Sequence, residues 1–266
     1  MDVRTVLQQA QRLRVSDGSL ASVFSGCEAS KRTLVLVWPQ LGDFDPLEYA
    51  WWIKRDRTKL EKGNIQVRAV GIGDLAAGKA FCNYTEFPPE HLFVDSDASL
   101  HHKLDLYRGL TASLPGSSSQ FDGYLNLLLM CAGIGSPGTL KEVFRGYKGD
   151  KSAPQLIADD EVIKAAPLPA LQGEVFKNAG GKGFQRPFEL ATLRLRNMGE
   201  VLGKWKTYVP DAAYLTQRGA TFLFEAGGDA PGEEVPGKLV YEWRDRNILG
   251  FAENMSNPLA FLDAIH

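Results

Sequence analysis

The feature that most limits the fold is an apolar strand that leads through a short loop directly into a helix. Leu34 to Val37 is an uninterrupted apolar run, which is typical of a strand covered on both faces. Pro46 suits the first turn of the following helix, because the N–H group that proline lacks is not needed there. We predict that this helix runs from Leu47 to Lys62 and stops at Gly63.

The same alternation of strand and helix continues along the chain. We predict strands at 65–72 and 92–94, and helices at 75–84 and 97–106, with Asp74 and Asp97 as their N-caps. A short helix at 3–14 precedes them. Such a β-α-β-α order indicates a largely parallel sheet with helices packed against it.

The alternation breaks after Leu110. Residues 111–215 contain helix and loop patterns and begin with a Ser/Gly-rich linker at 115–119. Strands return at 220–224 and 238–243, separated by a Gly/Pro-rich loop at 225–237, and a last short helix follows Pro258. We interpret residues 1–266 as one domain, with a core of residues 30–110 and 216–266 and a helical insertion of residues 111–215.

Composition argues against a nucleic-acid-binding protein, a membrane-spanning protein and a secreted disulfide-rich protein. The chain is 44% hydrophobic and has a net charge of −2, which gives no electrostatic reason to expect binding to nucleic acid. Its longest apolar cluster, 124–132, is far shorter than the roughly 20 residues that span a bilayer. Three scattered cysteines do not make a disulfide framework, and the N-terminus lacks a signal-peptide pattern. We therefore expect a cytoplasmic protein without a transmembrane segment.

Five segments together resemble the peroxiredoxin-like (AhpC/TSA-like) family of thioredoxin-fold proteins. They cover about half of the chain. The segments are 33–46, 70–82, 93–110, 218–224 and 239–243. We suspect the branch of this family found in cyanobacteria and chloroplasts. The resemblance implies an α/β, thioredoxin-like fold with a central mixed sheet, to which residues 111–215 add a large helical insertion.

The loop that carries the redox thiols in this family departs from the family pattern. The family reads roughly Gly-Cys-x-x-Cys, whereas this chain reads Gly42-Asp43-Phe44-Asp45-Pro46, so that Asp43 and Pro46 occupy the thiol positions. Asp43 cannot be oxidised, and a carboxylate before a helix is a good N-cap. The alternative is a general base or a metal ligand, joined by Asp45 and Glu48, but no histidine lies nearby to complete a metal site.

Three cysteines remain as candidates for redox chemistry. Cys82 is expected on the buried face of a helix, Cys131 ends an apolar helix, and Cys27 lies in a loop where it is the most accessible. None of them has an adjacent His or Lys that would lower the thiol pKa.

Other polar motifs predict neither a cofactor nor a metal. His101 and His102 are adjacent, so a helix would separate them by about 100° and leave them on a solvated face. The segment 70–74 lacks the third glycine of a dinucleotide-binding fingerprint. The Gly-rich segment 179–183 lacks the spacing of a phosphate-binding loop.

The insertion contains an apolar stripe on a helix predicted at 186–206. Six residues recur at spacings of three and four: Phe188, Ala191, Leu195, Met198, Leu202 and Trp205. Leu190, Leu193 and Val201 widen the stripe. We expect this stripe to pack mostly inward, with a groove for a partner as the alternative, and we expect neighbouring loops such as 148–154 to form a partner surface.

Thr139 and Glu142 have the spacing of a capping box. Trp51 and Trp52 point in directions too different for both to be buried in one core, so one is expected against the insertion or a partner.

These observations favour a family member that has lost its catalytic thiols and binds another protein. The expected interaction residues are Trp51, Trp52, Leu195, Leu202 and Trp205. The suspected lineage implies a role in the assembly or regulation of a photosynthetic complex, with a cytoplasmic, thylakoid-associated or stromal location. The alternative is an atypical thiol peroxidase or oxidoreductase that uses Cys27, Cys82 or Cys131.

Overall fold

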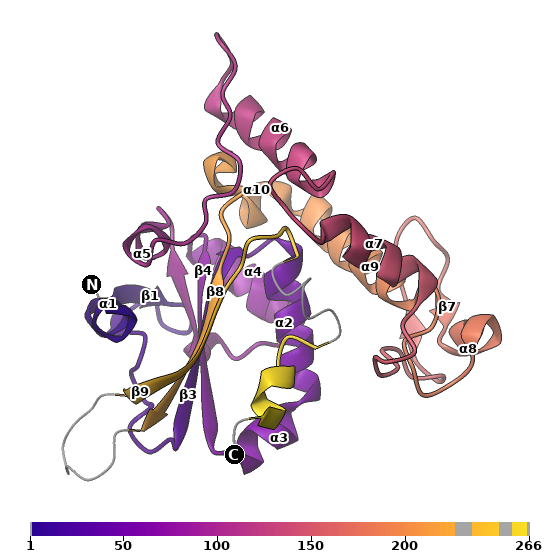
Figure 1. Ribbon diagram of the computed structural model, residues 1–266, viewed down its shortest axis with the longest axis horizontal. Coiled ribbons are helices and arrows are strands. Elements are labelled where there is room, and N and C mark those ends of the chain that lie inside the picture. The colour runs from indigo at the N-terminus through magenta and orange to yellow at the C-terminus, as the bar shows by residue number, and fades with distance from the viewer. Residues whose placement is uncertain (1, 227–235, 250–256, 265–266) are drawn as a thin grey trace.

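A computed structural model describes residues 2–226, 236–249 and 257–264 of the chain. Within them, a mixed seven-stranded sheet has the order β2-β1-β5-β4-β3-β8-β9. Its strands are β1 (Gln11–Arg14), β2 (Leu20–Ser22), β3 (Arg32–Gln40), β4 (Ile65–Ile72), β5 (Leu92–Asp95), β8 (Ala220–Ala226) and β9 (Pro236–Arg244). Strands β3, β4 and β5 are parallel, and β8 and β9 complete the sheet in antiparallel pairs. The sheet and its helices confirm the predicted α/β, thioredoxin-like class (Figure 1).

Strand β3 lies near the middle of the sheet because every one of its residues can be buried. Leu34 and Leu36 face one hydrophobic core, and Val35 and Val37 face the other. This alternation follows from the two-residue period of a strand. The predicted strand with two covered faces is therefore confirmed.

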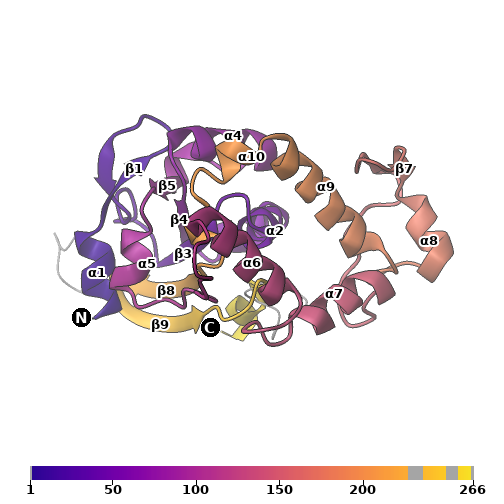
Figure 2. The ribbon, with the colours of Figure 1, turned by 90° about the horizontal axis from the view of Figure 1, so that it is seen from above.

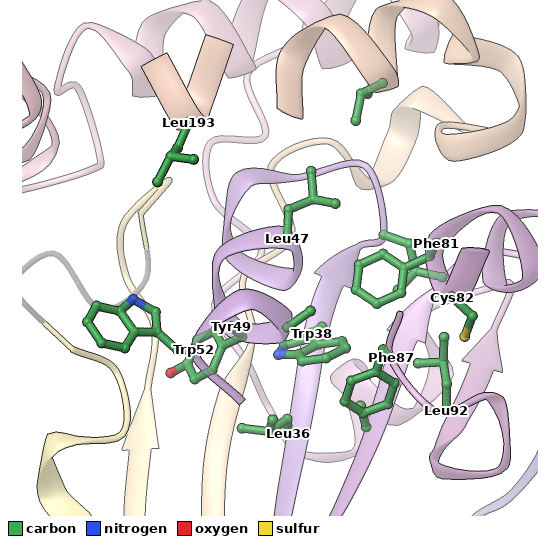
Figure 3. Close-up of a cluster of buried hydrophobic side chains, with 14 of the residues drawn as sticks. Leu36, Trp38, Leu47, Tyr49, Trp52, Phe81, Cys82, Phe87, Leu92 and Leu193 are labelled. Atoms are coloured by element: carbon green, nitrogen blue, oxygen red, sulfur yellow. The ribbon is translucent and has the colours of Figure 1, made fainter. Parts of the chain in front are cut away.

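Helices cover both faces of the sheet. Helices α1 (Val3–Gln9) and α5 (Ser99–Lys103) pack on the face that carries Val35 and Val37, which we call the first face. Helices α2 (Phe44–Arg55), α3 (Arg57–Lys62) and α4 (Leu75–Thr85) pack on the second face, which carries Leu34 and Leu36. Trp38 is at the centre of the second core, with its ring centroid 5.5 Å from that of Phe81 and 5.4 Å from that of Phe87 (Figure 3). Asp74 accepts a hydrogen bond from the backbone N–H of Ala77, which confirms it as the N-cap of α4.

The N-terminal helix is shorter than predicted. It ends at Gln9, and residues 11–14 form β1, which pairs with both β2 and β5. The predicted helix 47–62 is also divided, because α2 ends at Arg55 and α3 begins at Arg57. Local helical spacing did not reveal that β1 gains hydrogen-bonding partners from strands elsewhere in the chain.

His101 lies inside the protein, so its predicted position on a solvated face is wrong. Its side chain is fully buried in α5, which packs against the sheet. Its Nε2 atom is 2.8 Å from the carbonyl oxygen of Trp38, and its Nδ1 atom is 3.9 Å from the carboxylate of Asp95. The neighbouring His102 is exposed.

Residues 111–215 form an arm of helices beside the sheet. Its helices are α6 (Ser119–Cys131), α7 (Thr139–Lys148), α8 (Glu174–Gly180), α9 (Glu189–Gly203) and α10 (Trp205–Tyr208), with a small hairpin of β6 (Val162–Ile163) and β7 (Leu171–Gln172). Figures 1 and 2 both place α8 at the far end of the molecule from α1. Short 3₁₀ turns lie at Pro89–His91, Ala212–Tyr214 and Ala260–Ala264, the last of them where a C-terminal helix was predicted.

Glu142 ties the arm to the core instead of completing a capping box. The N-cap of α7 is Gly138, and the buried Glu142 accepts hydrogen bonds from Arg145 and Arg194. Arg194 also donates to Glu48 of α2, with 2.5 Å between its Nε and Glu48 Oε1. The capping-box prediction is wrong because burial turns this carboxylate toward two guanidinium groups.

Helix α9 buries the three residues that were predicted to widen the stripe and leaves half of the six-residue stripe itself exposed. The buried hydrophobic residues are Leu190, Leu193 and Val201, whereas Phe188, Met198 and Leu202 of the predicted stripe are exposed. Leu195 and Trp205 are partly buried, and Trp205 Nε1 donates to the hydroxyl of Tyr124 over 2.8 Å. The two faces have similar apolar spacing, so periodicity alone did not choose between them.

The last two predictions concern the loop at 225–237 and the absence of a transmembrane segment. Most of the predicted loop at 225–237 lies outside the described part of the chain. In the residues that are described, no helix is both long enough and apolar enough to cross a membrane.

Candidate functional site

The candidate site is the loop where β3 passes into α2. Gly42 is required there, because a Cβ atom at this position would lie 2.8 Å from the Cβ of Tyr208. Asp43 is the N-cap residue of α2, and Pro46 lies in the first turn of the helix. Both predicted positions are therefore confirmed.

Asp43 forms an ion pair instead of capping the helix. Its side chain makes no capping hydrogen bond among the described residues. Its Oδ2 atom instead accepts a hydrogen bond from Nη2 of Arg218 over 2.7 Å. The prediction was right about where Asp43 lies on the helix and wrong about what its carboxylate contacts.

Arg218 is the centre of this site. Its guanidinium is fully buried just before β8, and it donates to the backbone carbonyls of Leu215 and Thr216 as well as to Asp43. Asp45 lies 3.8 Å from its Nη1 atom. Burial alone would lower the pKa of Arg218, but the neighbouring carboxylates raise it above its usual value. The guanidinium is therefore charged and held in one position.

Asp245 is a third buried carboxyl group near Arg218. It follows β9, and its backbone N–H donates to the carbonyl oxygen of Gly219 over 3.0 Å. Burial raises the pKa of Asp245 to about 7, although Arg218 opposes this shift. One arginine thus faces three carboxyl groups, and Asp245 holds a proton through the acidic range.

Glu48 is not part of this cluster, although it lies close in sequence. Its carboxylate bonds to Arg194, on the side of α2 that faces the arm. Within the described residues there is no group of three or more His, Cys, Asp or Glu side chains that could hold a metal ion.

The three cysteines are free, and their order of exposure differs from the predicted one. Cys27 and Cys82 are buried, whereas Cys131 at the end of α6 is exposed. The prediction that Cys27 is the most accessible is wrong, because its loop folds back against the sheet near Thr33 and Arg68. Cys82 lies in the cluster of Phe81, Phe87 and other core side chains, as was predicted for a buried helix face (Figure 3).

None of the three thiols has a lowered pKa. Burial raises the pKa of Cys82 to about 12. Burial also raises the pKa of Cys27, although Arg68 opposes the shift. Desolvation by neighbouring protein atoms and the Asp43 carboxylate raise the pKa of the exposed Cys131, while Arg218 opposes them. At neutral pH these thiols are therefore mostly protonated, and the thiolate is the form that attacks peroxides and disulfides.

Arg218 and Asp245 were not identified as site residues from the sequence. Each is a charged residue at the end of an apolar strand, and β8 is antiparallel to β3. The start of β8 therefore lies at the end of β3 that leads into the Asp43 loop. A charged residue at the end of such a strand would have indicated a site residue, but only once the order of the strands in the sheet was known.

The predicted interaction residues do not form one surface. Trp52 is buried, and Trp51 is partly buried with its ring in edge contact with that of Trp52. Leu202 is exposed on α9, while Leu195 and Trp205 pack against the core.

Comparison with known proteins places the chain in a family. The model of the AhpC/TSA antioxidant enzyme family matches residues 52–247, which begin after the Asp43 loop. No curated protein matches the chain. Among solved structures, a cysteine-to-serine mutant of peroxiredoxin Q from Xanthomonas campestris is similar, with 12% identity, a TM-score of 0.40, and 99% of this chain and 96% of that chain covered. Since the family match spans well over half of its residues, this chain belongs to the AhpC/TSA antioxidant enzyme family.

Proposed function

We propose that this chain is a family member that does not reduce peroxides at its Asp43 loop and that binds another protein instead. The observation that carries the proposal is the ion pair between Asp43 and the buried Arg218. A carboxylate at this position cannot donate electrons to a peroxide, and here it is held in an ion pair with a buried guanidinium.

The arm supplies the support for protein binding. Several of its large hydrophobic side chains are exposed, among them Phe121, Leu128, Phe144, Phe188 and Leu202. Exposed apolar side chains that gather into one patch are typical of protein interaction sites. The proposal includes a partner in a photosynthetic complex and a cytoplasmic, thylakoid-associated or stromal location. That part rests on the resemblance to the cyanobacterial and chloroplast branch.

Peroxide consumption with a thioredoxin reducing system tests the catalytic half of the proposal. We expect no turnover by the wild-type protein. We expect a gain of peroxide reactivity in Asp43→Cys, because its thiol would lie at a helix N-terminus beside Arg218, where a thiolate is stabilised. Asp43→Ser is the matched control without a thiol. Wild-type turnover that disappears in Cys131→Ser would overturn the proposal.

Affinity capture from the native organism tests the binding half. The bait is the full chain, and the matched variant is Leu202→Asp, which changes an exposed side chain of the arm. We expect one dominant protein to be captured by the wild type and lost with the variant. Capture of the same proteins by both baits would contradict a partner site on this part of the arm.

Thiol chemistry at Cys131 is a second candidate function. Its thiol is exposed and lies within the electrostatic influence of both Asp43 and Arg218, close to the family's usual site. Attack on a peroxide would oxidise the thiol to a sulfenic acid as the O–O bond is reduced, and an external thiol would restore it. Mass spectrometry after peroxide treatment, with Cys131→Ser as the control, detects or excludes this product.

A further inference from the structure

A cleft of about 860 Å³ opens between the core and the arm. It is lined by one face of α2, the end of α4, the start of α9 and the loop around residues 155–161. Leu193 of α9 and Leu47 of α2 point into the space between their two helices (Figure 3). The cleft is separate from the Asp43 site, because neither Asp43 nor Arg218 lines it.

Part of the cleft wall is apolar and aromatic. Leu47, Leu190 and Leu193 line it, and Trp51 adds an indole ring that is only partly buried by the protein itself. The guanidinium of Arg55 lies over the Trp51 ring, 5.3 Å from its centroid. A ligand with an apolar body would cover these surfaces and remove them from water.

Most of the charged groups that line the cleft are paired with an opposite charge, but two arginines are not. Lys54 is paired with Glu86, and Glu48 is paired with Arg194. Arg145 is neutralised by Glu142 and Asp150. In the described part of the chain, Arg55 and Arg196 have no carboxylate partner, and they face only the exposed Glu161 among the remaining acids of the lining.

Two buried N–H donors in the lining also lack an acceptor. Gln185 is 1% exposed, and its Nε2 atom has no hydrogen-bond partner among the described residues. The same is true of the buried Nε atom of Arg196. Buried donors without a partner are costly, and both of these belong to residues of the cleft lining.

We propose that this cleft binds a small amphipathic anion, with a carboxylate at one end and an apolar chain or ring system as its body. The carboxylate accepts from Arg196 and Arg55, while the body lies against Trp51 and the leucines of α2 and α9. A carboxylate suits these donors because it offers two acceptor oxygens to a planar guanidinium. The apolar lining favours this ligand over a sugar phosphate or another wholly polar anion.

Calorimetric titration of the full chain with decanoate, below its micelle concentration, tests the proposal. We expect saturable binding at one site and at least tenfold weaker binding of decylammonium, which has the same chain and the opposite charge. Arg196→Gln and Arg55→Gln should each weaken decanoate binding at least tenfold. The matched control is Arg57→Gln, because Arg57 is an exposed arginine of α3 outside the cleft, and it should leave the affinity unchanged.

Thermal melts of each variant separate lost binding from lost folding. If Arg196→Gln does not fold, the exposed Arg55→Gln variant still decides the outcome. Equal affinity for decanoate and decylammonium would overturn the proposal. So would an unchanged affinity in both cleft variants, or the absence of saturable binding.

Discussion

At the scale of single residues, a buried ion pair organises the loop between β3 and α2. Asp43 at the N-terminus of α2 pairs with Arg218, which also donates to the backbone carbonyls of Leu215 and Thr216. Taking a guanidinium out of water is costly unless carboxylates and hydrogen bonds compensate it. Loss of the Asp43 charge should therefore lower the free energy of unfolding more than the loss of an ordinary helix cap would.

Replacement of Asp43 by Asn measures this dependence. The change removes the charge that pairs with Arg218 and should lower the free energy of unfolding by about 3–5 kcal/mol, the usual range for one partner of a buried pair. Denaturant titration gives this value. Asp17→Asn is the control, because Asp17 pairs with Arg14 at the solvent-exposed surface and its loss should lower the free energy of unfolding far less. A loss of about 1 kcal/mol for Asp43→Asn would indicate an ordinary cap.

The protonation of Asp245 makes stability depend on pH. Its pKa is about 7 in the folded protein, against about 3.9 in an unfolded chain. The folded state therefore holds the proton to higher pH, so this group's contribution to stability is complete below pH ~4 and is lost as the pH rises to ~7.

The measurement is a comparison of unfolding free energies for the wild type and Asp245→Asn. Since one pKa unit corresponds to about 1.4 kcal/mol, the difference between the two should change by a few kcal/mol in favour of the variant between pH ~4 and ~7. Other carboxylates titrate in both proteins and cancel. Parallel stability curves would show that Asp245 is ionised in the folded state throughout this range.

At the scale of elements, the long central strands β3 and β4 were easier to predict than the orientation of helices. The apolar run at 34–37 lies within a strand that is buried along its whole length, as expected. Helix α9 also exists as predicted, but its buried face is set by contacts with α2 and α7, which are distant in sequence. Arg218 was missed for the same reason, since only the pairing of β8 with β3 brings it to Asp43.

Two aspartate substitutions on α9 test which face is buried. Leu193 is 8% exposed, whereas Leu202 is 60% exposed. Leu193→Asp should lower the free energy of unfolding by several kcal/mol, since it places an unpaired charge in the core. Leu202→Asp should change it by less than about 0.5 kcal/mol. Thermal melts distinguish them, and a larger loss for Leu202→Asp would restore the originally predicted stripe.

At the scale of the whole molecule, the arm and the core are joined through a buried charge network. Arg194 of α9 bridges Glu48 of α2 and Glu142 of α7, and all three side chains are largely buried. The two carboxylates raise the pKa of Arg194 further above its usual value, although burial opposes them. The same junction forms the walls of the cleft, so its geometry governs both the arm's position and the proposed ligand site.

Arg194→Ala should therefore loosen the arm before it affects the sheet. The change leaves Glu48 and Glu142 without this partner, and the resulting penalty falls on contacts of α7 and α9 with α2. Hydrogen exchange should become faster in α7 and α9 and remain unchanged in β3 and β4. Arg57→Ala, which removes an exposed ion pair with Glu61, is the control. Faster exchange throughout β3 and β4 would instead show that arm and core open as one cooperative unit, and that the cleft cannot widen without unfolding the sheet.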